Sequence, residues 1–174
     1  MKTLSLFQAR ADVAEICGNP PQVMEMAGAL EHAVPSRDWL QDEFFYFWLN
    51  WKRGLGMEEG GSYQPGSGMC EWLTREFLQR LAVSARKGAP GRDINPCAFE
   101  VRVGVPRGYA LNGITDGGHS AILICTHEEN TTDESEPIKR TWRIAEAQAW
   151  YLTSFWTPLD IAVAGGVRLV TVID

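Results

Sequence analysis

The sequence has little of three things that would assign a chain to a broad class at once: cysteine, positive charge and long apolar runs. Four cysteines in 174 residues are too few and too scattered for a disulfide framework, so we expect reduced thiols and a cytoplasmic protein. Acidic residues outnumber basic ones by 22 to 16, which gives a net charge of −6. Because a nucleic-acid-binding surface normally needs a basic stripe, we expect no nucleic-acid partner.

The apolar stretch over residues 44–51 is eight residues long and has charged residues on both sides. A membrane-spanning helix needs about 20 apolar residues, so this stretch predicts a core or interface helix. The N-terminus carries one lysine and no long apolar region before Arg10 and Asp12, which is unlike a secretory signal. We therefore expect neither a membrane partner nor secretion.

The length suits a single domain over residues 1–174, and a composition of 45% apolar and 22% charged residues is ordinary for a soluble globular protein. Within this domain we expect a helical N-terminal subregion over residues 1–60 and a core over residues 61–174. Apolar spacing and proline punctuation predict three helices in the first part, over residues 8–17, 20–34 and about 36–52.

The third of these helices is apolar nearly all round, and Ser36 is its predicted N-cap. A helix of this kind is normally buried on several sides. The alternative is that its aromatic side chains, within residues 39–51, form an exposed surface for a protein partner.

The second half of the chain changes to a period of two. Alternation predicts four strands, over residues 99–105, 119–127, 138–148 and 167–173. The first has one wet face, and the second is apolar on both faces, so the second should be the central strand. Helices followed by a mostly antiparallel four-stranded sheet make an α+β fold.

Cys70 follows a loop rich in proline, glycine and serine and opens a helical pattern that runs to about residue 87. Leu73, Phe77 and Leu81 form one apolar face of this helix, so Cys70 lies in its first turn. Unpaired backbone N–H groups and the helix dipole favour the thiolate at that position, and the thiolate is the nucleophilic form. The alternative is a small buried residue that packs under the helix end.

His119 follows Gly117 and Gly118 and opens the predicted central strand, where it can face a helix N-terminus that packs across that end. On the next strand, alternation puts Glu146 and Gln148 on one face with apolar neighbours. Such polar groups need partners when buried, and a carboxylate that accepts the Nδ1–H of the histidine would orient the imidazole. The alternatives are a structural histidine and two polar side chains that simply reach solvent.

Three motifs resemble those of papain-like cysteine hydrolases in the broad sense, a group that includes transglutaminase-like domains. Cys70-Glu71 opens an amphipathic helix, Gly118-His119-Ser120 precedes an apolar strand, and the stretch over residues 144–148 reads Ile-Ala-Glu-Ala-Gln. This series is most similar to papain-like domains in phage-type proteins and in the protease domain of a mushroom agglutinin. It covers roughly residues 63–174, and alanine stands at position 147 where the series usually has proline.

The resemblance implies that residues 61–174 form a papain-like catalytic core with Cys70 as the nucleophile, His119 as the general base and acid, and Glu146 as the residue that orients the histidine. Gln148 is the alternative orienting residue. Gln64, six residues before the cysteine, is similar to the oxyanion-hole glutamine of papain.

The implied function is hydrolysis of an amide, peptide or isopeptide bond, on a peptide-like or peptidoglycan-peptide substrate, with no cofactor and no metal. The alternative is a catalytically inactive papain-like protein that serves as a binding module or as a phage structural or accessory protein. A zinc site at Cys125 and His127 fits no standard ligand spacing. The acidic stretch over residues 128–136 lacks the spacing of a calcium loop, so it predicts a solvated hairpin tip.

Overall fold

The computed structural model describes residues 2–18, 24–25, 31–54, 69–88, 94–115, 117–128, 139–147 and 156–173. Its helices are α1 (Leu6–Cys17), α2 (Arg37–Gly54), α3 (Met69–Gly88) and α4 (Leu159–Ala164). Its strands are β1 (Thr3–Ser5), β2 (Met24–Glu25), β3 (Glu31–Ala33), β4 (Ala98–Val105), β5 (Gly117–His127), β6 (Arg140–Ala145), β7 (Trp156–Pro158) and β8 (Arg168–Ile173). The predicted α+β class is therefore confirmed.

The main sheet has the strand order β2-β8-β4-β5-β6-β7. Strand β2 joins β8 in parallel, and all other pairings in this sheet are antiparallel. Strands β1 and β3 form a separate antiparallel ribbon. The predicted central position of residues 119–127 is confirmed, because β5 pairs with β4 on one side and β6 on the other.

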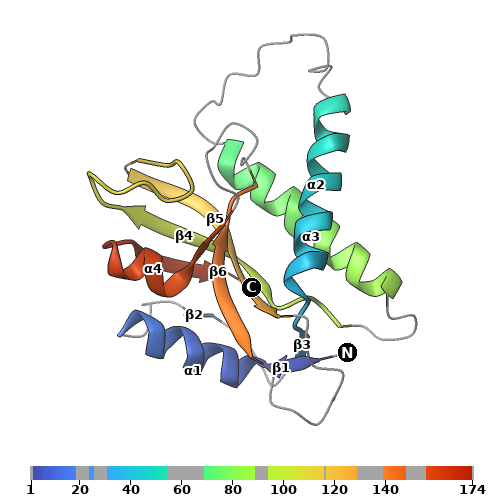
Figure 1. Cartoon of the computed structure of the whole chain (residues 1–174), viewed down its shortest axis with the longest axis horizontal. Coiled ribbons are helices and arrows are strands. Elements are labelled where there is room, and N and C mark those ends of the chain that lie inside the picture. The colour runs from blue at the N-terminus through green and yellow to red at the C-terminus, as the bar shows by residue number, and fades with distance from the viewer. Residues whose placement is uncertain are drawn as a thin grey trace.

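Helices cover both faces of this sheet (Figure 1). One hydrophobic cluster joins α1 and α4 to one face, and a second cluster joins α2 and α3 to the other. Strand β5 contributes to both clusters: Leu123 lies in the first, whereas Ile122 and Ile124 lie in the second. This explains why residues 121–125 of this strand are apolar without interruption.

The prediction of a helix over residues 20–34 is wrong. In its described part, β2 pairs with β8, and β3 pairs with β1 through Glu31, His32 and Ala33. Helical spacing of apolar residues is a weak preference, and pairing with a strand from elsewhere in the chain overrides it. The N-terminal subregion over residues 1–60 is therefore not purely helical.

The prediction of a four-stranded sheet is also wrong, since the described residues alone give the main sheet six strands. The two additional strands, β2 and β7, are two and three residues long, too short to display a period of two. Pro158 ends β7 and occupies the N-cap position of α4, without a side-chain hydrogen bond. Proline is well tolerated at a helix start.

The other helix predictions are confirmed. Residues 8–17 lie in α1, and Ser36 caps α2 by accepting a hydrogen bond from the backbone N–H of Trp39 at 3.1 Å. Among the side chains of α2 that the structure describes, Leu40 and Phe47 pack in one cluster with α3, whereas Phe45 and Tyr46 are exposed. Among the described helices, none combines the length and the hydrophobicity that crossing a membrane requires.

A polar cluster ties α1 to β6 on the face that carries α1. Asp12 accepts hydrogen bonds from Gln8, from the guanidinium of Arg140 and from the indole N–H of Trp142. Burial by itself raises the pKa of Asp12, but these hydrogen bonds outweigh it and lower the pKa below its usual value. The cluster anchors the strand after which Glu146 follows.

Candidate active site

Cys70 is the second residue of α3 and is half-buried. As their spacing predicted, Leu73, Phe77 and Leu81 are fully buried against the sheet. This packing holds the start of α3 over the start of β5, where His119 lies. The groups that lower the pKa of the Cys70 thiol are the His119 side chain and the backbone of Ser120 and Glu71, which places Cys70 beside the histidine.

These contacts change the acidity of Cys70. The hydrogen bond with His119 is the largest influence and lowers the pKa of the thiol. Burial acts in the opposite direction, and the backbone N–H groups add to the lowering. A thiol with a lowered pKa carries more thiolate at neutral pH, which is the reactive form.

His119 is the third residue of β5, and it is 8% exposed. The strand begins two residues earlier than predicted, at Gly117, whose φ of 86° is a conformation that favours glycine. The Nε2 atom of His119 lies 2.6 Å from Oε1 and 2.7 Å from Oε2 of Glu146. The histidine is therefore held between a sulfur and a carboxylate.

Glu146 directly follows β6 and is fully buried. Its neighbours Ala145 and Ala147 both pack in the cluster under α3, so alanine at position 147 fits a tightly packed site. The carboxylate contacts Nε2 of the histidine, not Nδ1 as the sequence analysis expected. The reason is geometric: the nitrogen that faces Glu146 depends on how the ring enters the site, which strand alternation does not specify.

The three groups stabilise a charged arrangement. Burial by itself lowers the pKa of His119, but the hydrogen bonds to Cys70 and Glu146 outweigh burial and raise the pKa to about 9. Burial also raises the pKa of Glu146, and the hydrogen bond from His119 opposes this increase. The pKa of the histidine therefore rises while that of Cys70 falls, and both changes favour a thiolate beside an imidazolium.

The other thiols differ from Cys70. Burial raises the pKa of Cys17. Cys97 and Cys125 are fully buried, and the hydrogen bond with Cys125, together with burial, raises the pKa of Cys97 well above its usual value. A lowered thiol pKa therefore distinguishes Cys70 from Cys17 and Cys97.

Two sequence-predicted residues, Gln64 and Gln148, lie outside the described residues. Cys125 and His127, considered for zinc, lie on β5, and among the described residues there is no group of three or more His, Cys, Asp or Glu that could hold a metal. Of the acidic stretch over residues 128–136 only Glu128 is described, and it pairs with Arg37 and Arg143.

A set of charged residues beside Cys70 was not predicted from the sequence. Glu71 pairs with Arg75 and with Arg102, and Arg75 also pairs with Glu100. The spacing of Glu71 and Arg75, four residues apart on a helix, was the available signal. Alternation with Phe99 and Val101 puts Glu100 on the predicted wet face of the strand over residues 99–105, but Glu100 is buried because α3 lies over it.

No family model matches this chain, and neither the curated proteins nor the solved structures contain a significant match to it.

Proposed function

We propose that this chain is a cysteine hydrolase of papain-like architecture that cleaves an amide, peptide or isopeptide bond. Cys70 is the nucleophile, His119 the general base and acid, and Glu146 the residue that orients His119. The observation that carries this proposal is the position of the His119 ring, which bonds to both oxygens of Glu146 through Nε2 and is close enough to Cys70 for each to shift the pKa of the other. A nucleophile, a base and an orienting acid in contact are the requirements for this chemistry.

In the first half of the reaction, the Cys70 thiolate attacks the carbonyl carbon of the substrate. The backbone N–H of Cys70, in the first turn of α3, has no partner within the helix and is the proposed donor to the tetrahedral oxyanion. Such a donor stabilises the transition state by about 3 kcal/mol. His119 gives its proton to the leaving amine, the C–N bond breaks, and a thioester to Cys70 remains.

In the second half, His119 is neutral and accepts a proton from water, which attacks the thioester carbonyl. The C–S bond breaks, the carboxylic acid product leaves, and the thiolate and imidazolium are restored. Because Nε2 is committed to Glu146, the remaining ring nitrogen, Nδ1, exchanges the proton. The proposed substrates are peptide-like and include peptidoglycan stem peptides, although the net charge of −6 disfavours anionic wall polymers.

The direct test compares the alkylation rates of the four cysteines with iodoacetamide at pH 7, followed by peptide mapping. We expect Cys70 to react at least about ten times faster than Cys17, because a lowered pKa raises the thiolate fraction. Cys17 is the internal control, since it is also half-buried but lies far from the histidine in sequence. Cleavage of a mixed peptide pool, compared with the Cys70→Ala variant, then tests hydrolysis.

The second candidate is a catalytically inactive papain-like binding protein. The exposed Phe45 and Tyr46 on α2, whose rings contact each other, favour a surface for a protein partner. Equally slow alkylation of all four cysteines would support this candidate and contradict the hydrolase.

The Glu146→Gln variant tests the role of the carboxylate through the acidity of the histidine. In the wild-type protein we expect His119 to lose its proton near pH 9. Removing the carboxylate charge removes one of the two groups that raise this pKa, so the midpoint should move to lower pH. NMR titration of the imidazole signals measures both midpoints. An unchanged midpoint would show that Glu146 does not act on His119.

A further inference from the structure

We propose that Glu100 is a positioning residue that holds the first turns of α3 against β4 and β5 and thereby sets the contact between Cys70 and His119. The role of Glu100 in catalysis rests on the proposed function, whereas its effect on the position of the Cys70 thiol relative to the His119 imidazole does not. Glu100 touches neither group, so it acts through the residues described below.

Glu100 is a buried acid at the junction of three elements. Its side chain is 7% exposed and belongs to β4. One oxygen accepts a hydrogen bond from Nε of Arg75 on α3 at 3.2 Å. The other accepts one from Oγ of Ser120 on β5 at 3.4 Å and lies 3.8 Å from the guanidinium of Arg102. A single carboxylate thus connects the Cys70 helix to the residue that follows His119.

Arg75 and Arg102 continue these contacts to the residue beside Cys70. Glu71 lies 2.5 Å from Arg75 and 2.8 Å from Arg102. In parallel, the buried hydroxyl of Thr74 donates to the carbonyl oxygen of Ser120 at 3.3 Å. Both ends of the Cys70–His119 contact are therefore held by the same group of side chains.

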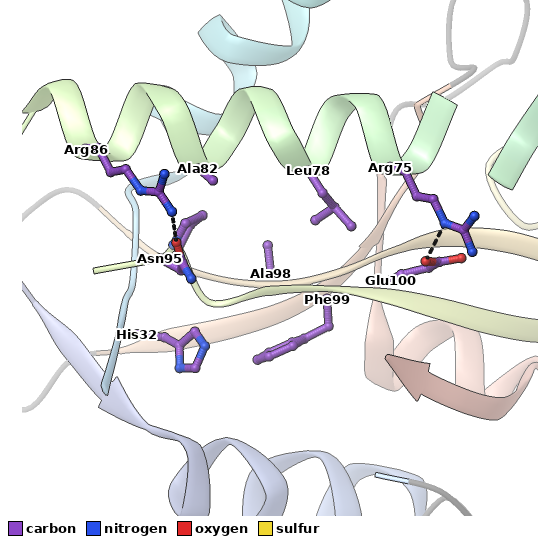
Figure 2. Close-up of a pocket in the computed structure, with 10 residues that line it drawn as sticks. His32, Arg75, Leu78, Ala82, Arg86, Asn95, Ala98, Phe99 and Glu100 are labelled. Carbon is purple, nitrogen blue, oxygen red and sulfur yellow. Dashed lines mark hydrogen bonds and ion pairs between the residues drawn. The ribbon is translucent and has the colours of Figure 1, made fainter. Parts of the chain in front are cut away.

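On the side of α3 that carries Arg75, the helix is held to β4 by polar contacts across a cavity. A cavity of about 350 Å³ lies there between α3 and the start of β4, with Leu78 and Ala82 on the helix side and Ala98 and Phe99 on the strand side. Figure 2 shows the two polar contacts that bridge it, Arg75–Glu100 at one end and Arg86–Asn95 at the other. The contact nearer to Cys70 is the one that Glu100 makes.

The sign of the expected effect separates positioning from simple electrostatics. The charged groups around Cys70 are Glu71 on its own helix, His119 on β5 with Glu146 behind it, and the Arg75, Arg102 and Glu100 set. Removing the charge of Glu100 leaves an excess positive charge, which alone would stabilise the thiolate and speed alkylation. Loosening the Cys70–His119 contact would have the opposite effect.

The experiment measures the rate of Cys70 alkylation from pH 5 to pH 10 in the wild-type protein and in Glu100→Gln. We expect the variant to react about ten times more slowly at pH 7, with the midpoint of the profile moved to higher pH, because small misplacements of reacting groups have large kinetic effects. The matched control is Glu43→Gln, since Glu43 accepts from Nε of Arg80 on the same helix, also at 3.2 Å. This control should keep the wild-type rate within about twofold, because Glu43 joins α2 to the later turns of α3, through Arg80 and Ser84, and not to the turn that carries Cys70.

A wild-type rate in Glu100→Gln, a midpoint moved to lower pH, or an equal loss in Glu43→Gln would each overturn the inference. If Glu100→Gln does not fold, Arg75→Lys is the second variant: it keeps the positive charge but lacks the Nε–H that donates to Glu100, so electrostatics alone predict no change whereas lost positioning predicts slower alkylation. These outcomes are separate from failure of the proposed function. An unreactive Cys70 or an inactive wild-type protein contradicts the hydrolase, whereas a reactive wild-type Cys70 with an unaffected Glu100→Gln variant contradicts only the role of Glu100.

Discussion

The His119→Ala variant is expected to react with iodoacetamide at Cys70 about 100 times more slowly than the wild-type protein at pH 6, because an ordinary thiol is almost entirely protonated there. The hydrogen bond from His119 is the largest influence that lowers the pKa of Cys70, so its loss returns the thiol toward ordinary acidity. The same variant lacks the proposed proton donor for the leaving amine, so amide hydrolysis should also be lost. Stopped-flow or mass-spectrometric alkylation measures the first effect without any knowledge of the substrate.

The matched control is His127→Ala, at the other end of the same strand. His127 is hydrogen-bonded through Nδ1 to the backbone oxygen of Glu128 at 3.2 Å and is not among the groups that affect the pKa of Cys70. We expect this control to keep the wild-type rate. Equal rates in the wild-type protein and in His119→Ala at pH 6 would rule out the thiolate–imidazolium pair.

Replacing Phe77 with alanine is expected to lower the free energy of unfolding by about 3–5 kcal/mol, the usual cost of truncating a buried aromatic side chain. Phe77 lies on the buried face of α3 and is fully buried. Its ring centroid lies 4.8 Å from that of Phe47 and 5.7 Å from that of Phe44, both on α2. Removal of the ring leaves a cavity where α2, α3 and the sheet meet. Urea unfolding followed by tryptophan fluorescence measures the change.

Two further variants make this result interpretable. Phe77→Leu keeps an apolar side chain in place and should cost only about 1–2 kcal/mol, so it gives a measurable value even if Phe77→Ala does not fold. Val83→Ala lies on the same helix at a position that is 44% exposed, and we expect a change within about 0.5 kcal/mol. Similar losses in Phe77→Leu and Val83→Ala would mean that Phe77 is not part of the core.

The helix that carries Cys70 and the strand that carries His119 can be predicted from the spacing of apolar residues along the sequence. The apolar spacing that begins at Cys70 predicts both the helix and the face that it buries, because residues three and four apart share a helix face. The apolar run after His119 predicts a central strand, because only a strand covered on both sides can bury every side chain. Both features depend on neighbouring residues, so the sequence is sufficient to predict them.

Other features depend on distant partners. Helical spacing over residues 20–34 was misleading because β1 and β8, which lie elsewhere in the chain, pair with parts of this region. Glu100 has the alternating position of a solvent-facing residue, yet it is buried because α3 packs over β4. No periodicity within one strand reports which helix will cover it.

The sequence by itself therefore determined the α+β class, the helix that carries Cys70 and the central strand that carries His119, since these arise from contacts between near neighbours. Only the tertiary structure decided that Glu146 bonds to Nε2 of His119, that Glu100 connects α3 to β5, and that six strands form the main sheet. These features join residues 20 or more positions apart, and such contacts exist only after the helices and the sheet have packed together.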